Sequence, residues 1–244
     1  MMNLVDNHGR RIRKLRVSLT DKCNLRCHYC MPVNQTFMDE SKYLNGDEIV
    51  EIVSELVDSG LEEVRLTGGE PLLRKSFSQI VERLAELKLK KLALTTNGIL
   101  LDKYIDVLTN AKVFHLNISL DSLNEENFKK ITFGNYLERV LKNIQIAKAA
   151  GLSVKINTVM MRGVNDHELL DFVKFSQEYG VDVRFLELMR IGYAREDQVD
   201  QFISANEMIG RIKEVTELKT VTSPLDSTSF NFLTSSGAQI GFIA

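Results

Sequence analysis

The sequence predicts an α/β protein whose alternating strands and helices form a partial (β/α)6 barrel of the TIM type, followed by a short β-rich extension. Two observations lead to this prediction. Strand-like runs alternate six times with amphipathic helical runs, which is typical of parallel sheets. Nearly every strand-like run has one polar and one apolar face, whereas an open sheet covered on both sides is apolar on both. A polar face indicates a wet interior that holds a ligand.

The first expected strand, 15–19, alternates Leu15 and Val17 with polar residues. Residues 46–59 have apolar positions at helical spacing and end at Gly60. The next strand, 64–67, breaks at two glycines, and a helix at 76–88 follows. A strand at 91–96 precedes a short helix near 102–109. These segments account for three strand–helix pairs with short loops between them.

The alternation continues with a strand at 113–120 and a helical pair over about 124–150, which ends at Gly151. A strand at 153–160 is followed by a helix at 166–179, ended by Gly180. The last pair is a strand at 182–188 and a helix at about 204–217. Two further runs, 230–233 and 239–243, flank a Ser-Ser-Gly turn as a hairpin. We therefore expect a barrel domain over 1–218 and a C-terminal β extension over 219–244.

Composition places the chain among ordinary globular proteins, with 44% hydrophobic and 26% charged residues in 244. The net charge of −2 argues against binding to nucleic acid or to an anionic membrane. There is no apolar run of bilayer length, and the polar, basic start does not resemble a secretory signal. The three cysteines lie too close together for a disulfide framework. We expect a protein of the reducing cytoplasm.

The strongest local signal is the cysteine spacing in the loop after the first strand. Cys23, Cys27 and Cys30 are the only cysteines, and they lie within eight residues. Three thiolates can hold three corners of a four-iron cluster and leave one iron open to a ligand. The alternative is a structural zinc site, which needs a fourth ligand such as His28. Three inert thiols are the remaining possibility.

The second expected strand ends in Thr67-Gly68-Gly69-Glu70-Pro71. A plain interpretation is a glycine turn into a helix, whose start is fixed by the proline. A functional interpretation is that the glycines let the backbone approach a ligand closely. Backbone carbonyls and the Glu70 carboxylate could then accept hydrogen bonds from a cationic amine.

Three cations lie on the polar faces of expected strands: Arg16, Arg65 and Lys155. Like charges that face one interior repel one another and are costly to desolvate. Carboxylates such as Asp121 or Glu187 could neutralise them. A bound triphosphate would also supply compensating charge, with acceptors suited to arginine. The residues alone leave both accounts open.

The cysteine spacing, with an aromatic residue before the last cysteine and Gly-Gly-Glu-Pro about forty residues later, resembles the radical S-adenosylmethionine (SAM) superfamily. The resemblance implies one [4Fe–4S] cluster on Cys23, Cys27 and Cys30. It also implies that SAM binds the open iron and is cleaved reductively to a 5′-deoxyadenosyl radical. The turn Gly68, Gly69 and Glu70 would belong to the SAM site.

Over nearly the whole chain, the sequence is similar to the GTP 3′,8-cyclases of molybdenum-cofactor biosynthesis. The segments that carry this similarity are 9–10, 15–23, 65–72, 95–98, 117–121, 155–157 and 184–189. The similarity implies a lyase that removes hydrogen from ribose C3′ of GTP and joins that carbon to C8. The implied SAM-binding residues are Tyr29, Gly69, Ser119 and Met189. Apart from the similarity, Ser119 and Asn157 are candidate contacts of a cofactor ribose or carboxylate, with polar filler of the barrel interior as the alternative. The implied GTP-binding residues are Arg16, Arg65, Thr95 and Lys155.

The similarity also implies a homodimer and an electron donor such as flavodoxin or ferredoxin. Two departures bear on activity. The sequence lacks the cysteines that hold the second, C-terminal cluster of the family. We therefore expect a truncated form, a fragment or a divergent relative that cyclises GTP poorly. Glu63 stands where the family tends to have a lysine that contacts phosphate. The alternatives are a radical SAM enzyme with another substrate and a non-catalytic iron–sulfur or zinc protein.

Overall fold

The computed structural model describes residues 4–32, 34–189, 196–222 and 228–244. Their contacts divide the chain into two compact units. The first unit comprises Met1–Asn24, Thr36–Asn117 and Ile146–Ser153, and the second comprises Leu25–Gln35, Ile118–Gln145 and Val154–Ala244. Residues 223–227 of the expected C-terminal extension lie outside the described residues. The expected division at residue 218 stays a prediction.

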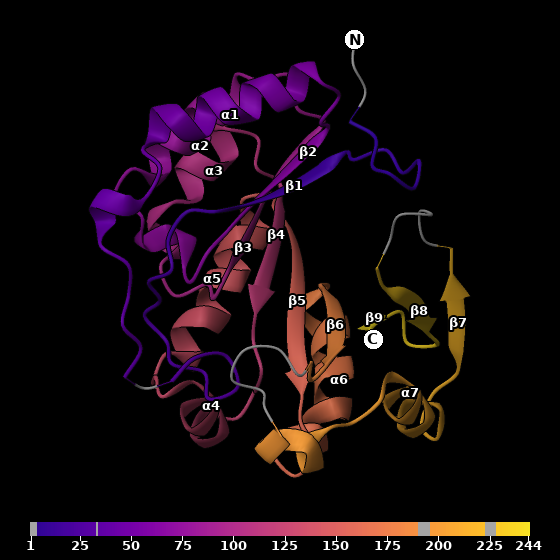
Figure 1. The fold of residues 1–244 in the computed structure, drawn as a ribbon. Helices are drawn as coiled ribbons and strands as arrows, with labels where there is room; N and C mark the ends of the chain where they lie inside the picture. The colour runs from indigo at the N-terminus through magenta and orange to yellow at the C-terminus, as the bar shows by residue number, and fades with distance from the viewer. Residues whose placement is uncertain (1–3, 33, 190–195, 223–227) are drawn as a thin grey trace. The chain divides into compact units, whose positions relative to one another are not determined.

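The first unit contains strands in the order β1-β2-β3-β4, and the pairs β1–β2 and β2–β3 are parallel. Helices α1, α2 and α3 lie together beside these strands (Figure 1). A short 3₁₀ turn precedes each of these helices. The elements are β1 (Lys14–Ser18), η1 (Glu40–Lys42), α1 (Gly46–Asp58), β2 (Glu63–Thr67), η2 (Pro71–Leu73), α2 (Phe77–Ala85), β3 (Lys91–Thr96), η3 (Leu101–Lys103), α3 (Ile105–Asn110) and β4 (His115–Ser119).

The second unit contains strands in the order β5-β6-β9-β8-β7. The pairs β5–β6 and β6–β9 are parallel, whereas β7, β8 and β9 pair antiparallel. Strands β4 and β5 and helix α5 each cross a unit boundary. The elements are α4 (Glu125–Thr132), α5 (Leu137–Ala149), β5 (Ser153–Met160), η4 (Asp166–Glu168), α6 (Leu169–Tyr179), β6 (Asp182–Glu187), η5 (Glu196–Gln201), α7 (Ala205–Lys213), β7 (Leu218–Val221), β8 (Phe230–Thr234) and β9 (Gln239–Ile243).

Local chemistry accounts for several element boundaries. The Asn45 side chain accepts a hydrogen bond from the Glu48 N–H, and the Glu48 carboxylate accepts one from the Asn45 N–H, which makes a capping box at the start of α1. Helix α6 ends at Gly180, which has a positive φ of 56°. A residue in the left-handed backbone conformation ends a helix, and glycine adopts this conformation at little energetic cost.

Strands β2 and β5 alternate between a buried and a partly exposed face, as the sequence predicts. On β2, Val64 and Leu66 are fully buried, whereas Arg65 and Thr67 are partly exposed. On β5, the same alternation places Val154 and Ile156 in a core and leaves Lys155 and Asn157 partly exposed. The apolar faces of β2 and β5 therefore face a core, and their polar faces can carry chemistry.

The sequence prediction of fold class is confirmed: the chain has an α/β fold with parallel strands and a β-rich C-terminal end. Most predicted elements match within a few residues. The last predicted helix was too long, because α7 ends at Lys213 rather than near residue 217. The parallel pairing of β9 with β6 was also not predicted. That pairing depends on a contact between distant segments, which periodicity does not report.

The core of the second unit gives a direct stability test. Phe185 of β6 is fully buried, and its ring centroid lies 6.3 Å from that of Phe172 and 5.5 Å from that of Phe242. We expect Phe185→Ala to lower the free energy of unfolding by about 3–5 kcal/mol, because it removes buried area and leaves a cavity. Chemical denaturation checks this. Phe230→Ala, at a side chain that is 63% exposed, should cost far less, and equal losses would contradict the assignment of the core.

Candidate cluster and cofactor site

In the first unit, the start of the cysteine loop, with Cys23, follows β1. The side-chain amide of Asn97, which follows β3, donates a hydrogen bond to Asn24 Oδ1 at 2.7 Å. The same nitrogen lies 3.8 Å from Cys23 Sγ. Asn97 is only 8% exposed, so its amide is held in place. An amide that faces a thiolate can stabilise the negative charge that iron coordination requires.

The two glycines after β2 allow a close approach of backbone to backbone. The Gly69 N–H donates to the Thr20 carbonyl at 2.6 Å, and the Glu70 N–H donates to the Lys22 carbonyl at 2.7 Å. A Cβ on Gly69 would lie 2.3 Å from that Lys22 oxygen, and one on Gly68 would lie 2.5 Å from the Thr20 oxygen. Any larger residue would therefore push the start of the cysteine loop away from the end of β2.

Glu70 is the most buried charged residue of this turn, with 1% of its surface exposed. Oε1 accepts hydrogen bonds from Thr96 Oγ1 at 2.7 Å and from the Leu72 N–H at 3.1 Å. Oε2 accepts one from the Asn97 N–H at 2.7 Å. Burial nevertheless raises the pKa of Glu70 to about 7, against the opposing effect of these donors. The carboxylate thus joins the ends of β2 and β3.

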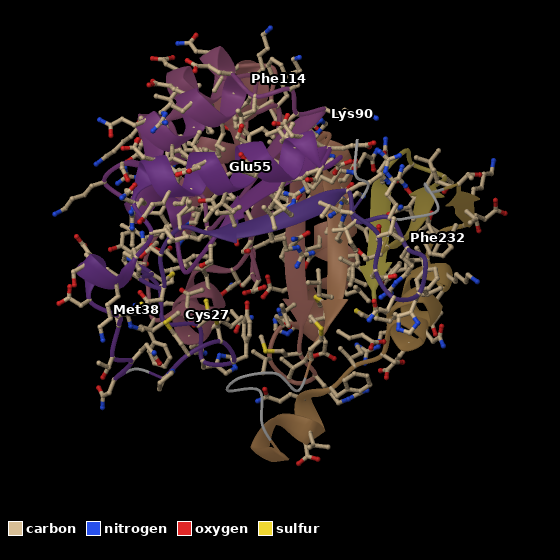
Figure 2. All side chains as sticks on the ribbon, turned by 45° about the horizontal axis from the view of Figure 1, so that its top comes forward. Cys27, Met38, Glu55, Lys90, Phe114 and Phe232 are labelled. Carbon is tan, nitrogen blue, oxygen red and sulfur yellow. The ribbon has the colours of Figure 1, made fainter. Side chains whose placement is uncertain are left out.

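In the second unit, Cys27 and Cys30 form a tight turn in which the Cys30 N–H donates to the Cys27 carbonyl at 2.8 Å. The loop is fastened to the end of α4, because the Arg26 N–H donates to the Thr132 carbonyl at 2.9 Å and the His28 N–H to the Ile131 carbonyl at 3.1 Å. Figure 2 shows Cys27 in this irregular segment.

Tyr29 lies between those two cysteines and donates its hydroxyl proton to Asp121 Oδ2 at 2.7 Å. Asp121 is 4% exposed, and its burial raises its pKa to about 6 although the Tyr29 hydroxyl lowers it. Desolvation, together with the Asp121 charge, holds the pKa of Tyr29 well above its usual range. At neutral pH the pair is therefore a phenol that donates to a carboxylate. The sequence placed Tyr29 in the site but did not identify Asp121 as its partner.

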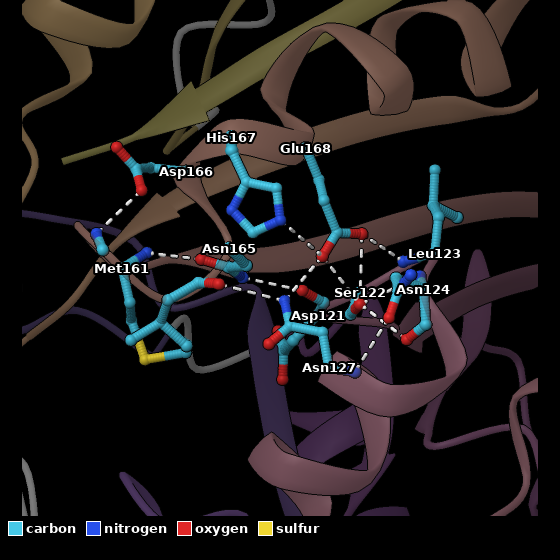
Figure 3. A network of polar contacts seen from close by, with 12 residues as sticks. Asp121, Ser122, Leu123, Asn124, Asn127, Met161, Asn165, Asp166, His167 and Glu168 are labelled. Atoms are coloured by element: carbon cyan, nitrogen blue, oxygen red, sulfur yellow. Dashed lines mark hydrogen bonds and ion pairs between the residues drawn. The ribbon is translucent and has the colours of Figure 1, made fainter.

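Glu168 is a second buried carboxylate, and it binds the residues that directly follow Asp121 (Figure 3). It accepts hydrogen bonds from Ser122 Oγ at 2.8 Å, from the Leu123 N–H at 2.6 Å and from Asn127 Nδ2 at 2.6 Å. These contacts join the loop after β4 to the turn η4. Sequence reasoning missed Glu168. A lone acidic residue at the start of a helix is usually explained by its favourable interaction with the positive end of the helix dipole.

The predicted phosphate-binding residues of the first unit share one face of its sheet. Arg16 of β1 and Arg65 of β2 are register partners, and Thr95 lies on β3 two residues beyond the partner of Arg65. Arg65 Nη1 donates to the Leu94 carbonyl at 3.4 Å. Two residues earlier on this face, Lys14 is the register partner of Glu63, with Lys14 Nζ 3.9 Å from Glu63 Oε2.

Lys155, in the second unit, has a carboxylate partner. Its Nζ lies 2.5 Å from Asp182 Oδ2 on the neighbouring strand, where the two residues are register partners. The sequence suggested Asp121 or Glu187 for this role, and both are engaged otherwise. Asp121 accepts from Tyr29, and Glu187 Oε1 accepts from the Ala205 N–H at 2.8 Å. The sequence left a carboxylate partner and a bound triphosphate open, and the carboxylate that Lys155 contacts is neither of the two named examples. The assignment of Lys155 to GTP binding stays a prediction.

The remaining predicted residues of the second unit are Ser119, Asn157 and Met189. Ser119 ends β4 with an exposed side chain, and Met189 follows β6 with 52% of its surface exposed. Asn157 Oδ1 is buried and has no hydrogen-bond partner within the part of the chain that the structure describes. A buried amide oxygen without a donor is unusual, and a bound ligand could supply one. The roles of these residues stay predictions.

Among the described residues, no group of three or more His, Cys, Asp or Glu side chains is arranged around one metal ion. A [4Fe–4S] cluster makes a different demand, since each cysteine binds a different iron. The amide donor beside Cys23 and the fastened turn of Cys27 and Cys30 fit such a ligand. We also find no helix in the described ranges that is both long and apolar enough to cross a membrane.

The fold and the cysteine loop together define a protein of the radical SAM class, and comparison with known proteins agrees. The family model described as the radical SAM superfamily matches residues 17–176. A GTP 3′,8-cyclase from Synechocystis sp. is 54% identical over 241 residues, which are 99% of this chain and 74% of the relative. A GTP 3′,8-cyclase from Aquifex aeolicus is 37% identical over 99% of this chain and 77% of the relative.

The chain therefore belongs to the radical SAM superfamily and, within it, to the family of the GTP 3′,8-cyclases. Membership implies a [4Fe–4S] cluster and SAM as cofactors, in agreement with the cysteine spacing. Among solved structures, Streptococcus suis SuiB bound to S-adenosylmethionine superposes with a TM-score of 0.71 at 18% identity, over 83% of this chain and 47% of SuiB. This likeness supports the fold alone.

The raised pKa of Glu70 predicts how stability changes with pH. The unfolded carboxyl ionises near pH 4.5, whereas the folded one keeps its proton to about pH 7, so the folded state binds more protons between these values. Stability from this group is therefore lost as the pH rises through that window, by up to about 3 kcal/mol.

Denaturant titrations of the metal-free protein at pH 5, 6 and 7 check this against Glu70→Gln, which cannot titrate. The unfolding free energy of the wild type should fall more steeply with pH than that of the variant. Glu86→Gln, at an exposed carboxylate, is the control and should keep the wild-type slope. Parallel curves for the wild type and Glu70→Gln would contradict the assignment.

Proposed function

We propose that this chain is a radical SAM enzyme of the GTP 3′,8-cyclase type, with GTP as substrate. The observation that carries the proposal is the 54% identity to a GTP 3′,8-cyclase over 99% of the chain. The proposed cluster ligands are Cys23, Cys27 and Cys30. When bound, the cluster supplies the electron that cleaves the SAM sulfonium and starts hydrogen abstraction from the substrate. An electron donor such as flavodoxin or ferredoxin, a homodimer and a cytoplasmic location belong to the proposal.

In the first unit, we propose Gly68 and Gly69 as contacts of SAM. Gly68 and Gly69 bring backbone close to the start of the cysteine loop, and a SAM amine could use carbonyl oxygens there. Both Glu70 oxygens already accept hydrogen bonds from the protein, so we assign this carboxylate to positioning the turn.

The second unit contains other residues that we propose as cofactor contacts. The proposed SAM contacts here are Tyr29, Ser119, Asn157 and Met189. Among them, Asn157 has the clearest structural support, because its buried amide oxygen lacks a donor among the described residues. A hydroxyl or amine of the cofactor would satisfy that oxygen.

The charge pattern on β1 and β2 supports a polyphosphate ligand. Glu63 neutralises Lys14, but the next pair on this face consists of two arginines, Arg16 and Arg65, side by side. Adjacent like charges repel, and an anion with several oxygens offsets that cost while it accepts paired hydrogen bonds. Thr95 would add a hydroxyl on β3. In the second unit, Lys155 is paired with Asp182, so it can bind a phosphate only if it shares or exchanges that partner.

Anaerobic reconstitution with iron and sulfide tests the cluster assignment. We expect about four irons per chain, and reductive cleavage of SAM to 5′-deoxyadenosine. Cys27→Ala should lose the cluster and this product. Ser41→Ala, at an exposed serine after the cysteine loop, should retain both. A chain that binds zinc instead, or a cluster whose spectrum SAM does not change, would refute the proposal.

The substrate is tested by adding GTP and measuring 5′-deoxyadenosine and the cyclised nucleotide separately. We expect GTP to stimulate formation of 5′-deoxyadenosine. Because these 244 residues supply cysteines for one cluster only, we expect little cyclised product. Efficient cyclisation would show that one cluster suffices. Cleavage of SAM that GTP does not influence would instead indicate another substrate.

The arginine pair is tested by GTP binding under anaerobic conditions. We expect Arg16→Ala to weaken binding by about tenfold or more, since a charge-assisted hydrogen bond to phosphate is worth roughly 1.5–3 kcal/mol. Lys14→Ala is the matched control on the same strand and face, and its cation is already paired with Glu63. Equal weakening by both variants would show that only the overall charge matters.

A further inference from the structure

The hydroxyl of Tyr29 is the point at which the cysteine turn meets the interior of the second unit. It donates to Asp121 Oδ2 at 2.7 Å, and the Tyr29 side chain packs against a buried cluster of Ile131, Met161 and Leu188. The interior thus holds this side chain by one directional contact and by apolar packing.

Tyr29 also lies inside the spacer that sets the separation of two thiols. Together with His28 it forms the two residues between Cys27 and Cys30, and it directly precedes Cys30. Any movement of the tyrosine ring that shifts its backbone therefore also shifts the backbone that carries Cys30.

Asp121 is itself held from several sides. Its Oδ1 accepts a hydrogen bond from the Val159 N–H at 2.9 Å, near the end of β5. Its backbone carbonyl accepts one from Asn165 Nδ2 at 2.6 Å. Asn165 is fully buried, and it also donates to the Val159 carbonyl at 2.9 Å and accepts from the Met161 N–H at 2.7 Å. Figure 3 shows Asn165 between Asp121 and Met161.

Stability alone does not account for this arrangement. A buried carboxylate loses hydration, and an apolar pair of similar size would often be at least as stable. Its hydrogen bonds are directional, however, so they fix the position of the tyrosine more narrowly than apolar packing would. Iron sites benefit from such order, because ligands that are positioned before the metal binds need little rearrangement.

We propose that Asp121, held by Asn165, is a positioning residue that keeps the Cys27–Cys30 turn in its cluster-binding shape through the hydroxyl of Tyr29. The inference rests on the proposed assignment of these cysteines as cluster ligands. The end of α4 fastens the backbone of the loop, and the Tyr29–Asp121 contact fastens the turn itself. Tyr29 would then contact SAM through its backbone or ring, since its hydroxyl proton is already donated to Asp121.

The test compares Tyr29→Phe and Asp121→Ala with two matched controls. Tyr104→Phe removes a tyrosine hydroxyl that donates to the Leu72 carbonyl at 3.1 Å in the first unit. Ser176→Ala removes a buried hydroxyl of the second unit that donates to the Val181 carbonyl at 2.7 Å, and Ser176 contacts neither Asp121 nor the cysteine turn. Circular dichroism and thermal melts establish that each variant is folded before it is compared.

The first readout is amide hydrogen exchange of residues 26–31 in the metal-free protein. We expect Tyr29→Phe to speed exchange in this segment by about tenfold, which corresponds to about 1.4 kcal/mol and to the loss of one hydrogen bond. Asp121→Ala should do the same, and the double variant should add little, because both changes break one contact. The two controls should leave exchange in this segment unchanged.

The second readout is the rate at which an iron chelator removes iron from the reconstituted protein. We expect faster release from Tyr29→Phe and Asp121→Ala and wild-type release from the controls. Unchanged exchange and unchanged iron release in Tyr29→Phe would overturn the proposal, as would strictly additive effects in the double variant. If the wild type itself binds no cluster, the proposed function fails, while the exchange measurement still decides whether the contact holds the turn.

Discussion

The carboxylate of Glu70 lies inside the first unit with almost no contact with water, and the ends of β2 and β3 are arranged around it. Such a group is tolerated only when donors surround it, and here a hydroxyl and two backbone N–H groups do so. One of those donors is the backbone of Asn97. Its position brings the Asn97 side chain to Asn24 and Cys23. The start of the cysteine loop thus depends on how one buried carboxyl group is hydrogen-bonded.

The second unit contains two further buried carboxylates that accept several hydrogen bonds. Asp121 accepts from Tyr29 and Val159, and Glu168 accepts from the loop after β4. Asp121 lies just after β4 and Glu168 ends η4, and each accepts hydrogen bonds from backbone and side-chain donors of another segment. Hydrogen bonds to a buried carboxylate are directional and costly to lose, so they fix loops more narrowly than apolar packing does. Loops with few regular backbone bonds can be held in this way.

The polar faces of the strands show two different arrangements of charge. Lys14 faces Glu63 across β1 and β2, so that a cation and an anion occupy one register position. At the next position on the same face, Arg16 and Arg65 are register partners, and two cations stand next to each other. A binding measurement on that pair bears directly on the substrate.

The sequence by itself determined the α/β class, the alternation of buried and polar strand faces, and the residues of the cysteine loop, because these depend on local periodicity and on the spacing of rare residues. It left open whether a carboxylate or a bound triphosphate neutralises Lys155. Only the tertiary structure decided that Asp182 pairs with Lys155, that Asp121 holds Tyr29, that Glu70 binds the end of β3, and that β9 pairs with β6. These contacts join segments far apart in the chain, and their geometry depends on strand register and burial, which no local pattern records.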